Sequence, residues 1–110
     1  RWFTAEFIER EPVVFAMIRD VFVHIDKEGY ALNCEAIDAT DLRPEVPGTK
    51  VPALVISGTH DVATLPEQGR ELAQALPGAR YVELDAAHIS NIEKSESFTK
   101  TVLDFLTEPK

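Results

Sequence analysis

At 110 residues, with 45% hydrophobic and 27% charged residues, the chain has the composition of a globular protein and the length of one small domain or part of a larger one. Nineteen acidic against eleven basic residues give a net charge of −8, which argues against nucleic acid and anionic membrane as partners. No apolar run reaches the roughly 18 residues of a membrane span, and a single cysteine, Cys34, excludes an internal disulfide framework. A cytoplasmic protein that does not interact with membranes is therefore expected.

Residues 1–40 predict three short helices in succession, because their apolar residues recur at helical spacing. The first has its apolar residues within 3–8. The second begins at Pro12, a residue that suits the first turn of a helix, and ends near residue 22. The third covers roughly 27–39 and contains Cys34, which as a free cysteine is expected to be buried by packing.

From residue 41 onwards the pattern changes to alternating strands and helices. Residues 40–52, "TDLRPEVPGTKVP", contain three prolines and a glycine and predict a connecting loop, and "ALVISG", 53–58, is typical of a strand buried on both faces. Thr64 and Glu67 have capping-box spacing and predict a helix that ends at Pro77-Gly78. A second strand is predicted at 80–84 and a last helix at about 95–106, so the fold class is α/β with parallel strands.

Two parallel strands with two helices are too few for an independent sheet, because both faces of a parallel sheet must be covered. We therefore expect further strands from an N-terminal portion that precedes Arg1 or stays bound as a separate piece. The start of the chain agrees with this expectation, since it opens on Arg1-Trp2-Phe3 and has its single methionine, Met17, inside an apolar stretch.

Two polar side chains follow the two predicted strands directly. Asp61 comes after the first strand in "SGTHD", and His88 after the second in "LDAAH". The carboxyl ends of neighbouring parallel strands meet at one edge of a sheet, where open α/β sheets bind ligands. A carboxylate there can hold an imidazole so that its other nitrogen takes a proton from a nucleophile. The sequence thus predicts two members of a catalytic triad, against the simpler alternatives of a turn-capping aspartate and an ordinary histidine.

The third member of such a triad is missing from the chain. Its serines are Ser57, Ser90, Ser95 and Ser97, and none of them lies in a G-x-S-x-G sequence. The single thiol, Cys34, follows no predicted strand. His24 and His60 are expected to be solvated or hydrogen-bonded, and no metal is expected because the spacing of metal ligands is absent. Near His88, we interpret Ile89 and Asn91 as packing and turn residues, and Glu93 as a charge at the start of the last helix.

Residues 58–99, "GTHDVATLPEQGRELAQALPGARYVELDAAHISNIEKSESFT", resemble the C-terminal part of 3-oxoadipate enol-lactonases, α/β-hydrolases of aromatic catabolism. "RWFT", 1–4, and "GYALNCEAI", 29–37, resemble the helical cap of that family. The resemblance implies a cap portion at 1–40 and the C-terminal portion of an α/β-hydrolase core at 41–110. It also implies that Asp61 is the triad acid and His88 the triad base, with the nucleophile upstream, since α/β-hydrolases order nucleophile, acid and histidine along the chain.

The activity implied by the resemblance is hydrolysis of a small-molecule enol-lactone to 3-oxoadipate without a cofactor. Trp2 is a candidate substrate-binding residue in the cap, and Arg1 a candidate for attracting a substrate carboxylate. The implied partner is an N-terminal part of the fold that carries the nucleophile, so this chain alone is expected to be inactive. Two alternatives stay open: another α/β-hydrolase, such as a carboxylesterase or a carbon–carbon bond hydrolase, and a non-catalytic truncated fragment.

Overall fold

Three helices form the first third of the chain in the computed structural model, which describes residues 2–108. They are α1 (Ala5–Arg10), α2 (Pro12–Val23) and α3 (Lys27–Asp38), and they confirm the helical prediction for this region. Local capping sets where they begin. Thr4 Oγ1 accepts a hydrogen bond from Phe7 N at 3.2 Å, and an Asp26 carboxylate oxygen accepts one from Gly29 N at 2.8 Å.

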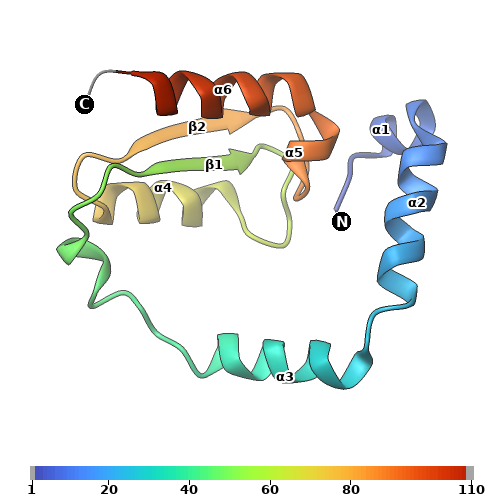
Figure 1. Ribbon diagram of the computed structural model, residues 1–110, viewed down its shortest axis with the longest axis horizontal. Coiled ribbons are helices and arrows are strands. Elements are labelled where there is room, and N and C mark those ends of the chain that lie inside the picture. The colour runs from blue at the N-terminus through green and yellow to red at the C-terminus, as the bar shows by residue number, and fades with distance from the viewer. Residues whose placement is uncertain (1, 109–110) are drawn as a thin grey trace.

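The second part of the chain has the predicted order of strand, helix, strand and helix. After the 3-10 turn η1 (Val46–Gly48) come β1 (Leu54–Gly58), α4 (Pro66–Ala75), β2 (Arg80–Leu84), α5 (Ser90–Glu93) and α6 (Ser95–Thr107). The strands are parallel and pair in register from Leu54 opposite Arg80 to Gly58 opposite Leu84. Helices α4 and α6 lie on opposite sides of this pair (Figure 1). The α/β fold class is confirmed.

In this region one local prediction was wrong and one short helix was not predicted. Helix α4 is capped by Leu65 rather than Thr64: Gln68, not Glu67, reaches back to accept a hydrogen bond from Leu65 N at 2.8 Å. Thr64 lies one residue before this cap, and its hydroxyl donates to the Asp61 carboxylate. Helix α5 was not predicted at all, since four residues are too few to show a helical period.

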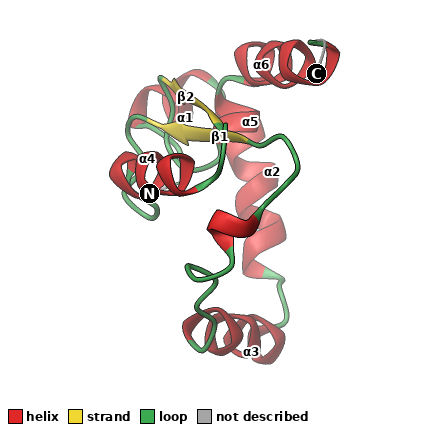
Figure 2. Ribbon diagram, turned by 90° about the vertical axis from the view of Figure 1, so that its left-hand side faces the viewer, coloured by secondary structure: helices red, strands yellow, loops and turns green. Residues whose placement is uncertain are grey.

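The buried apolar residues gather where α1 meets the segment that follows β2. They are Phe3, Phe7, Leu84, Ala86 and Ala87. By contrast, α2 and α3 contain no buried residue, and both views show α3 standing apart from the strands (Figures 1 and 2). Cys34 is therefore exposed, and its predicted burial was wrong, because a helical period identifies a face without supplying a partner for it.

Several large apolar side chains of α2 are also open to solvent, among them Val13, Met17 and Val21. These three residues are spaced four apart, which places them on one face of α2, and contiguous exposed apolar surface often marks an interaction site. Within residues 2–108, none of the helices combines the length and apolar character needed to cross a membrane.

Candidate active site

Asp61 and His88 lie beside each other beyond the carboxyl ends of β1 and β2. His88 Nδ1 is 2.8 Å from Asp61 Oδ2, although the two residues are 27 positions apart in the chain. The parallel register of the strands produces this contact, since it brings Gly58 opposite Leu84 and so starts both following turns at the same edge. The structure therefore brings the two predicted residues together in the expected geometry.

Close approach of the two turns fixes their relative position. His60 N donates to Ala86 O at 3.0 Å, and Thr59 N donates to Leu84 O at 2.9 Å. At Gly58 the backbone passes so near to the segment after β2 that a Cβ atom would overlap the carbonyl oxygens of Ala86 and Ala87. A glycine is required at this point because any side chain would push the Asp61 turn away from the His88 turn.

The environment of Asp61 keeps its carboxylate ionised. The residue is 6% exposed, and its Oδ1 atom accepts from Ala63 N at 2.8 Å and Thr64 N at 3.0 Å. Burial raises the pKa of Asp61, but the hydrogen bonds from His88, Thr64 and Ala63 outweigh burial and lower the pKa to about 2. Asp61 thus caps its own turn with one oxygen and faces His88 with the other, so the two roles considered from the sequence are compatible.

With its Nδ1 atom engaged by Asp61, His88 has Nε2 left to exchange a proton. The imidazole is 38% exposed and lines a hollow of about 390 Å³. The hollow is lined by β1 residues 55–58, by Leu65 before α4, and by α4 residues Gln68, Gly69 and Leu72. Among the described residues β1 pairs with β2 alone, so its other edge opens on this hollow, next to the Asp61–His88 pair.

Thr64 is a site residue that sequence reasoning missed. Its Oγ1 atom donates to Asp61 Oδ2 at 2.8 Å and lies 3.3 Å from His88 Nδ1. The hydroxyl therefore helps to hold the carboxylate oxygen that faces the imidazole. A signal was available, because an aspartate followed three residues later by threonine commonly forms a local hydrogen-bonded turn.

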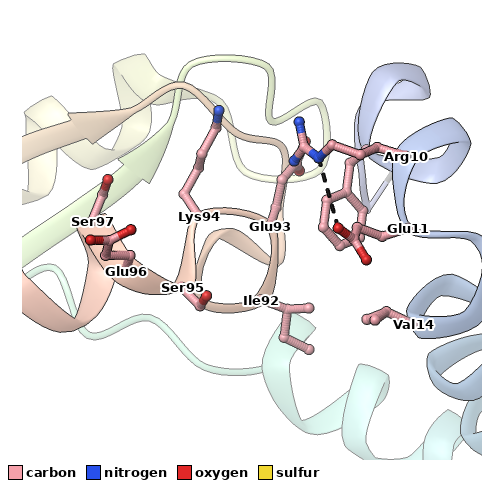
Figure 3. Close-up of a pocket in the computed structure, with 10 residues that line it drawn as sticks. Arg10, Glu11, Val14, Ile92, Glu93, Lys94, Ser95, Glu96 and Ser97 are labelled. Atoms are coloured by element: carbon pink, nitrogen blue, oxygen red, sulfur yellow. Dashed lines mark ion pairs between the residues drawn. The ribbon is translucent and has the colours of Figure 1, made fainter.

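Glu93 is a second residue whose role was misread. The sequence indicated only a charge at the start of the last helix, whereas Glu93 ends α5, two residues before α6 begins, and is 5% exposed. Its carboxylate accepts hydrogen bonds from Ala87 N at 2.9 Å, from Thr4 N at 3.2 Å, and from Thr4 Oγ1. In Figure 3 the side chain extends from α5 toward α1, beside a hollow lined by both regions. Asn91 is exposed, but it lies within α5 rather than in a turn, so its predicted turn role was wrong.

Trp2 occupies a different place from the Asp61–His88 pair. Its ring centroid lies 3.5 Å from that of Phe22, and its side chain lines a mostly apolar hollow of about 310 Å³ together with α1 and α2 residues. Only its backbone approaches the histidine turn, since Trp2 O accepts a hydrogen bond from Ile89 N at 3.0 Å. Its part in substrate binding stays a prediction. Arg1 lies outside the described residues.

The other histidines are hydrogen-bonded, as predicted. His60 Nε2 lies 2.8 Å from Asp85 Oδ1, and His24 Nδ1 lies 2.8 Å from Asp20 O. Both pairs are exposed. Over residues 2–108, no three His, Cys, Asp or Glu side chains are grouped closely enough to hold a metal ion.

One family model and two enol-lactonases match most of this chain. The Abhydrolase_4 family model, described as TAP-like protein, matches residues 24–110. The chain is 80% identical to the enol-lactonase from Burkholderia xenovorans LB400, whose crystal structure superimposes with a TM-score of 0.96 over 98% of this chain and 42% of that one. It is 35% identical to 3-oxoadipate enol-lactonase 2 of Acinetobacter baylyi over 93% of this chain and 38% of that protein.

A thermophilic esterase from Thermogutta terrifontis is also similar, with 25% identity and a TM-score of 0.88 over 96% of this chain and 40% of the esterase. The chain thus spans about two fifths of the length of these relatives. The resemblance to enol-lactonases drawn from the sequence is confirmed.

Proposed function

The chain belongs to the α/β-hydrolase family described by the model that matches residues 24–110, and we propose that it contributes the acid and the base of an enol-lactone hydrolase. The proposed reaction converts 3-oxoadipate enol-lactone to 3-oxoadipate in the cytoplasm, as part of aromatic-compound catabolism. The proposal depends chiefly on the 2.8 Å contact between His88 Nδ1 and the buried, ionised carboxylate of Asp61.

In the proposed mechanism the nucleophile is a serine on an N-terminal part of the fold. His88 Nε2 takes the serine proton as the hydroxyl attacks the lactone carbonyl, and then donates it to the leaving enolate oxygen. The same nitrogen next takes a proton from water, which attacks the acyl-enzyme, and returns that proton to the serine oxygen as the open acid is released. Asp61 holds the imidazole in the required tautomer and stabilises the imidazolium that forms twice in each cycle.

The open edge of β1 supports an N-terminal part as the partner. A parallel strand beside β1 would extend the sheet and close the 390 Å³ hollow, and residues following such a strand would face His88. We further propose that residues 1–40 form part of the cap and 41–110 part of the core. In that arrangement Trp2 contributes to binding of the lactone, and Arg1 attracts its carboxylate.

A carboxylesterase is a second candidate, because the similar protein from Thermogutta terrifontis is an esterase. A substrate panel on the full-length protein separates the two. Turnover of the enol-lactone by the wild type, lost in His88→Ala, is the expected result. Cleavage of simple aryl esters with no opening of the lactone would instead assign the esterase activity. No turnover of any ester or lactone would favour a non-catalytic chain.

A further inference from the structure

The turn that carries His88 is attached to the start of α1 on both sides of the histidine. Before His88, Ala87 N donates to Glu93 Oε2 at 2.9 Å, and the same carboxylate accepts from Thr4. After His88, Ile89 N donates to Trp2 O at 3.0 Å. Residues 2–4 are thus bound to the histidine turn at two points, although about 85 residues separate the two segments in the chain.

The carboxylate of Glu93 suits this position better than a neutral side chain. It receives two backbone N–H groups and one hydroxyl, and Thr4 Oγ1 already accepts a hydrogen bond from Phe7 N, so its proton points to Glu93. All of these groups donate. A glutamine would present its NH₂ group to one of the donors, and an alanine would leave buried donors without an acceptor.

These contacts hold His88 from the backbone side, while Asp61 holds its ring. Ala87 N belongs to the peptide unit directly before that of His88, so movement of Ala87 would swing the imidazole relative to Asp61. The proposed mechanism needs Nε2 at a fixed place between the nucleophile and the leaving oxygen, and a displacement of about 1 Å can cost roughly 100-fold in rate.

We propose that Glu93 is a positioning residue, which ties the entry of the cap at Thr4 to the histidine turn at Ala87 so that cap and base move as one body. The inference rests on the proposed function for its kinetic consequence. Its structural consequence, the fixed contact between His88 and Asp61, is independent of the substrate.

The test uses the full-length protein with Glu93→Gln, Glu93→Ala, Thr4→Val and Thr4→Ser, and Glu96→Gln as the control. Glu96 is an exposed acid three residues further along, in the first turn of α6. We expect kcat to fall roughly 10- to 100-fold in Glu93→Ala, less in Glu93→Gln, with KM little changed. Thr4→Val should lower kcat and Thr4→Ser should retain it, because serine keeps the hydroxyl. Effects of Thr4→Val and Glu93→Gln should be non-additive when combined.

The second readout is the far-downfield NMR resonance of the His88 Nδ1 proton, which needs no substrate. It should broaden in Glu93→Gln and Thr4→Val, and stay sharp in Glu96→Gln. If Glu93→Ala does not fold, these two milder variants decide the question. Folded variants with an unchanged resonance and unchanged kcat would overturn the positioning role. A broadened resonance in a protein that opens no lactone would support the positioning role while refuting the proposed function.

Discussion

Replacing Asp61 with asparagine exchanges one carboxylate oxygen for an NH₂ group, so that a hydrogen-bond acceptor of the site becomes a donor. Asp61 Oδ2 accepts from His88 Nδ1 and Thr64 Oγ1, and Oδ1 accepts from Ala63 N and Thr64 N. An asparagine has only one acceptor oxygen. Because the two backbone N–H groups at Oδ1 cannot turn away, we expect the amide oxygen to face them and the NH₂ group to face His88.

That arrangement forces His88 Nδ1 to accept and places the ring proton on Nε2, the nitrogen that must take the proton of the nucleophile. We expect kcat of the full-length protein to fall on the order of 10⁴-fold, as tautomer reversal does in catalytic triads. A loss of stability should accompany it. Lowering the pKa of Asp61 from 3.8 to about 2 corresponds to about 2 kcal/mol of folding free energy at neutral pH.

The sign of the pH dependence follows from this lowered pKa. A carboxylate with a depressed folded-state pKa stabilises the protein fully above its unfolded value of 3.8, and the stabilisation is lost as the pH falls through about 2. The difference in unfolding free energy between wild type and Asp61→Asn should therefore be constant near neutral pH and shrink between about pH 4 and pH 2.

Lactone turnover and urea unfolding at several pH values measure the two effects. Asp85→Asn is the matched control, because Asp85 also lies 2.8 Å from a histidine, His60, yet its side chain is 77% exposed. We expect Asp85→Asn to keep kcat and to change stability by less than about 0.5 kcal/mol. Equal kcat values for Asp61→Asn and wild type would refute the assignment of Asp61 as the triad acid.

Two further substitutions probe how the site is held. Gly58→Ala should destabilise the protein by about 1–3 kcal/mol and lower kcat, because its Cβ would overlap the carbonyls of Ala86 and Ala87. Gly48→Ala is the control, since a Cβ there meets nothing within 4 Å. It should change neither stability in urea unfolding nor lactone turnover. Thr64→Val should lower kcat by roughly tenfold, because it removes the hydrogen bond from the hydroxyl to the charged Asp61 carboxylate. Thr64→Ser keeps the hydroxyl and should retain activity. Equal rates for both variants would show that the hydroxyl is dispensable.

The sequence was sufficient to predict residues whose position follows from strand order. Asp61 and His88 come directly after two strands, and parallel pairing alone brings them to one edge of the sheet. Helices with several turns, such as α2 and α6, were likewise predictable from their apolar spacing. These features depend on local pattern and on a simple topological rule.

Features that depend on contacts between distant segments were not predictable. In the sequence Glu93 looks only like a charge at the start of a helix, and its burial arises from contacts with the distant Thr4 and with Ala87. Thr64 fits a helix cap by spacing, but Leu65 caps the helix and the Thr64 hydroxyl donates to the Asp61 carboxylate. Cys34 lies on a helix that looks suited to packing, although no described element covers it.

The central proposal is that the Asp61–His88 pair activates a serine that lies outside residues 1–110. An organophosphonate that reacts with activated serines, followed by peptide mass spectrometry of the full-length protein, tests this most directly. We expect one labelled serine in a segment that precedes this chain, and loss of labelling in His88→Ala. A label on Ser57, Ser90, Ser95 or Ser97, or undiminished labelling in His88→Ala, would contradict the account.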